Sequence, residues 1–191
     1  MGLATSQALV PQLLNKATHK NLAEMTQLIG GVFLLALLAQ VSIPLPWTPV
    51  PITGQTLGIA LVSLSWGQKR AFTVVLTYLA LGSLGLPIFA MGKSGLLLGP
   101  TAGYLIGMAI ASIIVGSLAD RGFTKTFKHS LVASFAGSAA IFTCGLIGLS
   151  FYVPQDQLMA AGLLPFIPGD VIKNLIAATT SRSLRKLTQL S

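Results

Sequence analysis

The sequence carries very little charge for its length. Only 8% of its 191 residues are charged, and four of them are acidic, whereas an ordinary soluble domain carries about 25% charged residues. The mean hydropathy is +0.79 and 53% of the residues are hydrophobic. This balance excludes an ordinary soluble domain and predicts a chain that lies in lipid.

Several signatures of chemistry are also absent from the sequence. Cys144 is the sole cysteine, so no disulfide framework or thiolate metal site is available. The two histidines, His19 and His129, lie outside the apolar runs and form no His-Glu-x-x-His motif. No Gly-x-x-x-x-Gly-Lys loop for ATP is present. We therefore predict a protein that is not an enzyme and holds neither a metal nor a cofactor.

Long uncharged runs divide the chain into transmembrane segments. No charged residue occurs between residues 25 and 68, and four prolines at residues 44–51 split this stretch into two spans joined by a loop. Residues 68–70 are expected to form a tight polar turn. The sequence predicts an all-α integral membrane protein with six transmembrane helices. They are placed at residues 26–43, 52–66, 71–86, 101–119 and 130–152, and at 170–180 with a possible start at 162.

The basic residues indicate how these helices are oriented. The chain has a net charge of +8, but its Lys and Arg residues flank the spans, which favours a role in membrane orientation over nucleic acid binding. Ten of the twelve fall on one side of a six-span topology, which predicts that both termini are cytoplasmic. We expect residues 1–24 to be a cytoplasmic segment, either a surface helix or an unstructured tail. Residues 25–186 then form the transmembrane domain, and residues 187–191 a C-terminal tail.

Two ionisable residues stand at the external end of the last predicted helix. Asp170 and Lys173 are three residues apart, which places them on one helical face. Because ionisable groups at membrane depth are costly, they indicate a functional site that faces a cavity. The alternative is a mutually neutralising pair that only caps the helix, and in either case we expect Asp170 to accept from backbone N–H groups at the helix start.

Small residues recur in the fourth and fifth predicted spans. Gly99, Gly103, Gly107 and Ala111 follow one another at four-residue spacing, a pattern that lets membrane helices approach closely. Ser138 lies in a similar small-residue context in the fifth span. We interpret both patterns as helix packing.

Three loop strings resemble the BioY family, the biotin-specific substrate-binding (S) components of energy-coupling factor (ECF) transporters. The first is Ile43-Pro-Leu-Pro followed by Pro49-Val-Pro-Ile-Thr-Gly-Gln-Thr56, the second is Gly85-Leu-Pro-Ile-Phe-Ala90 followed by Gly99-Pro-Thr-Ala-Gly-Tyr104, and the third is Pro165-Phe-Ile-Pro-Gly-Asp-Val-Ile-Lys173. They occur in the family's order and between the expected spans.

The resemblance implies the S-component fold and a multi-pass protein of the cytoplasmic (inner) membrane. Such a protein captures biotin from outside the cell for uptake. The resemblance also implies a transmembrane T component and two cytoplasmic ATPases as partners. The alternatives are an S component for another vitamin such as thiamine or riboflavin, a membrane enzyme, and a structural or assembly protein.

By this resemblance, Asp170 accepts a hydrogen bond from the ureido ring of biotin, and Lys173 donates one to the ureido oxygen or the carboxylate. Further polar candidates are Gln55, Ser94, Thr101 and Tyr104, and candidates for stacking are Trp47 and Phe89, with loop packing as the alternative role for each. The chain departs from the family pattern in three places: Gln40 stands where the Ala-x-x-x-Ala docking motif that S components often carry would have its second Ala, Lys93 interrupts a glycine-rich loop, and Ala102 replaces a commoner Gly.

Overall fold

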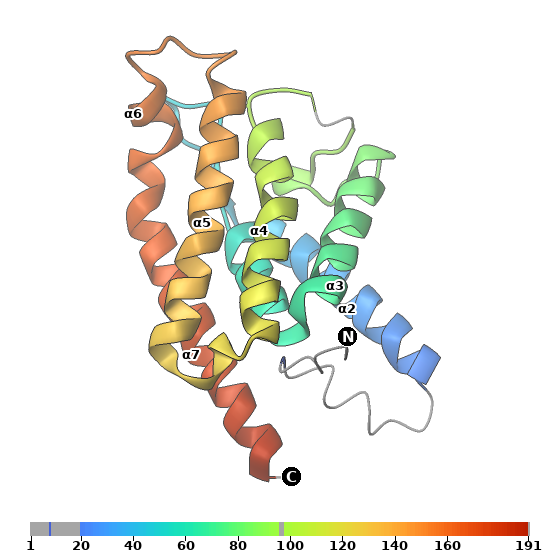
Figure 1. Cartoon of the computed structure of the whole chain (residues 1–191). Helices are drawn as coiled ribbons and strands as arrows, with labels where there is room; N and C mark the ends of the chain where they lie inside the picture. Colours follow the sequence, from blue (N-terminus) through green and yellow to red (C-terminus); the bar gives the residue numbers. More distant parts are fainter. Residues whose placement is uncertain (1–7, 9–19, 96–97, 191) are drawn as a thin grey trace, which may run out of the picture.

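The fold is a bundle of long helices joined by short elements at its two ends (Figure 1). The computed structural model describes Ala8, residues 20–95 and residues 98–190. The predicted N-terminal segment therefore lies mostly outside the described residues. The long helices are α2 (Lys20–Gln40), α3 (Gln55–Ser83), α4 (Ala102–Asp120), α5 (Phe127–Leu149) and α7 (Ile167–Leu190). The short elements are β1 (Ser42–Ile43), β2 (Ile52–Thr53), η1 (Ala90–Gly92), η2 (Phe123–Lys125), α6 (Leu158–Gly162) and η3 (Leu164–Phe166).

Helix α3 contains a sharp bend, visible at its lower end in Figure 1. Gly67 has φ 76° and ψ 178°, a conformation essentially restricted to glycine. A Cβ atom at this position would overlap the carboxylate of Asp120, which accepts a hydrogen bond from the backbone N–H of Gln68 at 2.9 Å. Residues 68–70 therefore continue as helix on the far side of the bend, and do not form the predicted tight turn. The described residues contain five long helices where the sequence predicted six.

In the described part of the chain, four segments are long and apolar enough to cross a membrane. They are Asn21–Gln40, Ala102–Asp120, Phe127–Leu149 and Leu158–Lys186. The predicted spans at residues 26–43, 101–119 and 130–152 coincide closely with three of them. The fourth begins before residue 162, so the short elements α6 and η3 contribute to its length.

Helix α4 packs closely against α5 through glycines. A Cβ atom on Gly103 would overlap the carbonyl oxygen of Cys144, and one on Gly107 would lie 2.8 Å from the Cα atom of Ile141. The predicted small-residue packing is confirmed for these two positions. Gly99 takes no part in it, because it has φ 130° in the preceding loop and has open space around it.

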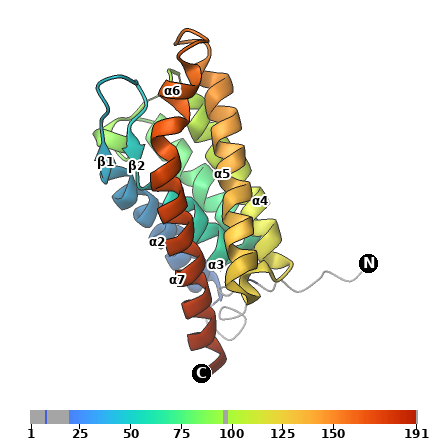
Figure 2. The same cartoon turned by 90° about the vertical axis from the view of Figure 1, so that its left-hand side faces the viewer.

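The two ends of the bundle differ in composition. At one end, called here the basic end, Arg70 forms an ion pair with Glu24 at 3.2 Å, and Arg185 donates a hydrogen bond to Thr124 at 2.7 Å. The opposite end, called here the cavity end, holds the β1–β2 hairpin, η1 and α6 (Figures 1 and 2). Figure 2 shows the hairpin beside the start of α7.

Candidate ligand-binding site

Three segments far apart in the sequence converge at the cavity end. The antiparallel pair of β1 and β2 leads directly into the start of α3, and the N–H of Gly54 donates to the carbonyl of Val41 at 2.8 Å. The loop after α3 folds back so that Phe89 lies over Gly82, where a Cβ atom would overlap the phenyl ring. The first turns of α7 complete the enclosure. These are the segments that carry the three sequence strings described above.

Together with α4 and α5, these segments enclose a cavity of about 170 Å³. Its polar lining consists of Thr53, Gln55, Thr56, Lys93, Ser94, Thr101, Asp170 and Lys173. Its larger apolar side chains are Phe89, Leu98, Tyr104, Leu105, Met108, Ile141, Phe142 and Phe166. A mostly apolar wall with a few convergent polar groups is typical of a small-molecule site.

Asp170 belongs to a buried hydrogen-bonded group. Its Oδ1 atom accepts from the hydroxyl of Ser138 on α5 at 2.8 Å, and its Oδ2 atom accepts from Nδ2 of Asn174 at 2.8 Å. The same amide nitrogen donates to the Ser138 hydroxyl at 2.9 Å, which closes the group into a ring. The oxygens of Asp170 are thus held by side chains, and not by the backbone N–H groups that the sequence analysis expected. The arrangement fixes a carboxyl group at the cavity wall.

Lys173 lies on the same face of α7 and lines the same cavity, as the spacing predicted. Its Nζ atom donates to the hydroxyl of Thr56 at the start of α3, at 3.2 Å. In the part of the chain that the structure describes, Asp170 and Lys173 are therefore bonded to different neutral partners. Among the described residues no direct ion pair joins the two side chains, although their opposite charges lie near enough to attract each other.

Gln55 is held by a second chain of hydrogen bonds. Its Nε2 atom donates to the hydroxyl of Tyr78 at 2.7 Å, and this hydroxyl donates to the carbonyl of Ile88 at 3.0 Å. Gln55 is only 4% exposed. The chain of bonds connects both halves of α3 to the loop that carries Phe89, so it fixes two walls of the cavity relative to each other.

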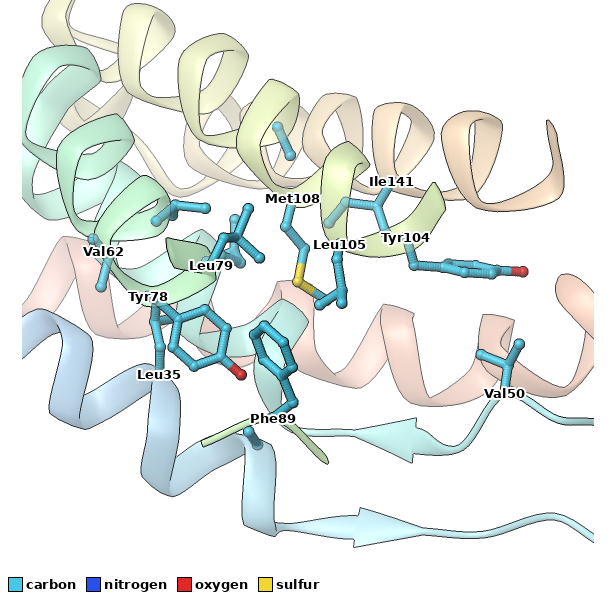
Figure 3. Packing of buried hydrophobic residues seen from close by; sticks show 14 of the residues in the cluster. Leu35, Val50, Val62, Tyr78, Leu79, Phe89, Tyr104, Leu105, Met108 and Ile141 are labelled. Atoms are coloured by element: carbon cyan, nitrogen blue, oxygen red, sulfur yellow. The ribbon is translucent and has the colours of Figure 1, made fainter. Parts of the chain in front are cut away.

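Aromatic rings form much of the apolar wall. The rings of Tyr78 and Phe89 pack edge to face, with centroids 5.4 Å apart, beside Leu105 and Met108 (Figure 3). The hydroxyl of Tyr104 donates to the carbonyl of Gly162 at 2.7 Å. Because this hydroxyl is already paired with the backbone, the ring of Tyr104 is its main contribution to the cavity.

The structure brings seven of the eight predicted site residues to this cavity. They are Gln55, Phe89, Ser94, Thr101, Tyr104, Asp170 and Lys173. Trp47 is not among the lining residues and is 63% exposed in the connection between β1 and β2.

Sequence reasoning missed five polar residues of the site. They are Thr53, Thr56, Lys93, Ser138 and Asn174. Asn174 could have been found, because it lies four residues after Asp170 and therefore on the same helical face. Ser138 was interpreted as helix packing, but it bonds to Asp170 across 32 residues of sequence. A contact between residues so far apart in the sequence cannot be recognised from local spacing.

A sequence model of the BioY family matches residues 12–190. The chain belongs to the BioY family. This BioY chain is 36% identical over 167 residues to the biotin transporter BioY of Thermotoga maritima, which covers 85% of this chain and 98% of that one. It is also 33% identical over 171 residues to the biotin transporter BioY of Rhizobium etli, and this match covers 84% of this chain and 90% of the relative.

A solved structure shares the fold of this BioY chain. It is the crystal structure of the S component for biotin from an ECF-type ABC transporter, with a TM-score of 0.81 and 28% identity. The match covers 89% of this chain and 94% of that chain. Family membership and the four apolar helices together identify a membrane protein, and the family is one of transporters and not of enzymes.

Proposed function

We propose that this protein is the biotin-binding S component of an ECF-type vitamin transporter, and that it captures biotin from outside the cell. The observation that carries the proposal is the cavity between Phe89 and the start of α7, in a chain of the BioY family. It combines a carboxyl group, two amines and an aromatic wall. Each of these has a counterpart in the chemistry of biotin.

The polar groups of the cavity match the polar ends of the vitamin. A ureido ring has two N–H donors and one acceptor oxygen, so we assign Asp170 as acceptor for an N–H group. Lys173 donates to the ureido oxygen or to the carboxylate of the valeryl chain. Lys93 also lines the cavity and supplies a second cation for that carboxylate. Charge-assisted hydrogen bonds of this kind are roughly twice as strong as neutral ones.

The apolar lining matches the rest of the molecule. The sulfur-containing ring and the valeryl chain of biotin expose little polar surface, so aromatic and aliphatic side chains are suitable partners. Phe89, Tyr104 and Phe166 present such surface from three different segments. Gln55, Ser94 and Thr101 add neutral hydrogen-bonding groups at the same wall.

We further propose that the chain crosses the cytoplasmic membrane six times, with both termini in the cytoplasm. The bend at Gly67 divides α3 into two helical halves, which we assign as separate crossings. The basic end then faces the cytoplasm, because Lys and Arg concentrate on the cytoplasmic side of membrane proteins. The cavity end faces outward, where the vitamin arrives.

We also propose that the chain works with a transmembrane T component and two cytoplasmic ATPases. The sequence has no Gly-x-x-x-x-Gly-Lys loop, so the chain lacks the usual phosphate-binding element for ATP. Energy for uptake then comes from the partner chains. Co-purification of ATPase subunits from the native membrane tests this assignment.

Binding of biotin to the purified protein tests the central proposal. A ligand that binds only the folded state stabilises it by RT ln(1 + [L]/Kd), which is about 2.7 kcal/mol at a concentration of 100 Kd. We expect biotin to raise the unfolding temperature in detergent by several degrees and to remain bound through washing. Stabilisation by thiamine or riboflavin in place of biotin would contradict the proposal, as would the absence of any effect.

A further inference from the structure

Gln40, the last residue of α2, contacts the loop that forms one wall of the cavity. Its Nε2 atom donates to the carbonyl of Phe89 at 3.1 Å, and its Oε1 atom accepts from the N–H of Gly92 at 3.1 Å. These bonds span 49 and 52 residues of sequence. One side chain thus joins the end of the first long helix to both ends of the turn Phe89–Gly92.

The turn itself has an unusual backbone. Met91 has φ 62° and Gly92 has φ 66°, and Met91 is the one residue other than glycine with a positive φ in the part of the chain that the structure describes. Such a conformation is uncommon for a residue with a side chain and persists where the surroundings hold it in place. Within the turn, the N–H of Gly92 also donates to the Phe89 carbonyl at 3.1 Å. The two bonds from Gln40 attach this closed turn to the helix bundle.

The position of this turn determines the position of several cavity groups. Phe89 stands within the turn and packs against Tyr78, while Lys93 and Ser94 follow it directly and line the cavity. If the turn moved away from α2, the aromatic wall and one of the two amines would move with it.

The same end of α2 also holds the opposite wall. Val41 follows Gln40, and its carbonyl accepts from the N–H of Gly54 at 2.8 Å, immediately before Gln55 and Thr56. The end of α2 is therefore bonded to the segment that begins α3 and to the turn that carries Phe89. Both segments of the cavity wall are therefore held by Gln40 and Val41, at the end of α2.

We propose that Gln40 is a positioning residue for the ligand cavity, which holds the Phe89–Gly92 turn in place over a bound ligand. This inference rests on the proposed function for the identity of the ligand. The contact requires a donor and an acceptor side by side at the end of one side chain, which Nε2 and Oε1 of the Gln amide supply. Glu at this position offers acceptors only, and Ala offers neither.

Two variants of Gln40 test this role. Gln40→Ala removes both bonds, and Gln40→Glu keeps the acceptor for Gly92 but loses the donor to Phe89. We expect faster hydrogen exchange in peptides covering residues 86–95 of the ligand-free protein in both variants. We also expect biotin to dissociate about fivefold faster or more, as the loss of one to two hydrogen bonds implies, while the unfolding temperature of the ligand-free protein falls by no more than a few degrees, since the same bonds also contribute to the folded state.

Gln155→Ala is the matched control, because Gln155 is an exposed glutamine of the α5–α6 connection at the same end of the molecule. We expect Gln155→Ala to leave hydrogen exchange in residues 86–95 and the rate of biotin dissociation unaltered. Unchanged exchange in both Gln40 variants would overturn the proposal, and so would faster exchange without faster dissociation. If the unaltered protein binds no biotin, the proposed function fails, whereas the exchange measurement still tests the Gln40 contact by itself.

Discussion

At the scale of single residues, the account depends on the carboxyl group of Asp170. This group is 7% exposed, and each of its oxygens accepts one hydrogen bond, from Ser138 or from Asn174. A carboxylate has about four lone-pair sites, so two acceptor positions remain for a ligand. The hydrogen bonds from Ser138 and Asn174 also fix the orientation of the carboxyl group, and therefore the direction in which its two remaining acceptor positions point. Asp170 is thereby prepared to receive N–H groups without rearrangement.

We expect Asp170→Asn to weaken biotin binding by roughly 10-fold to 100-fold. Hydrogen bonds to charged groups contribute about 1.5 to 3 kcal/mol, and the substituted amide also places an NH₂ group where Ser138 and Asn174 need an acceptor. The measurement is the dissociation constant from calorimetric titration of the purified variant. Asp156→Asn is the control, because it makes the same change at an exposed residue outside the cavity lining. Equal affinity for the Asp170 variant and the unaltered protein would refute the assignment.

The sequence allowed the ionisable members of the site to be predicted, but not their neutral partners. Asp170 and Lys173 stand out because charges are scarce in apolar helices, and their spacing fixes a common face. The bond from Lys173 to Thr56 joins residues 117 positions apart, and that from Ser138 to Asp170 joins residues 32 apart. Such pairings are set by how the helices pack, which local spacing does not encode.

At the scale of elements, the bend in α3 sets the position of both helical halves. It depends on Gly67, whose backbone conformation excludes other residues and whose Cα faces the carboxylate of Asp120 on α4. One glycine therefore allows α3 to reverse direction and to approach α4 closely. The first half of α3 carries Gln55 and Thr56, and the second half carries Tyr78, so the bend also sets the cavity walls.

We expect Gly67→Ala to destabilise the protein by about 1 to 3 kcal/mol or more. The methyl group forces a residue with a side chain into a glycine-only region of backbone space and overlaps the Asp120 carboxylate. The measurement is the unfolding temperature of the purified protein in detergent. Gly30→Ala is the control, since Gly30 lies within α2 with open space around it, and alanine is a better helix former than glycine. Equal losses from the two substitutions would contradict this account of the bend.

The bend also shows where prediction of the elements from sequence reached its limit. Apolar runs and prolines located the spans, because burial in lipid requires about 20 apolar residues and proline breaks a helix. The polar residues 68–70 predicted a tight turn, since a change of direction usually needs several residues outside the helix. Here a single residue makes the change. This change of direction at one residue depends on the contact between Gly67 and Asp120 of α4, which the local sequence does not reveal.

At the scale of the whole molecule, the bundle separates two chemically different ends. The basic end gathers Arg70, Arg185 and their partners, and the cavity end gathers Asp170, Lys173 and Lys93. Charge asymmetry along the sequence predicts that the basic end faces the cytoplasm. A transporter subunit that receives its ligand from outside requires the cavity to open on the side away from the basic residues.

One labelling measurement in intact cells tests this arrangement and its ligand together. Cys144→Ala removes the native thiol, and Ser94→Cys then places a single cysteine at an exposed position of the cavity wall. Lys125→Cys in the same background is the control at the basic end. We predict that a membrane-impermeant maleimide labels position 94 in intact cells, that biotin slows this labelling while thiamine does not, and that position 125 reacts only after the cells are permeabilised. Labelling of position 94 only after permeabilisation, or at a rate that saturating biotin leaves unchanged, would contradict an outward-facing biotin site.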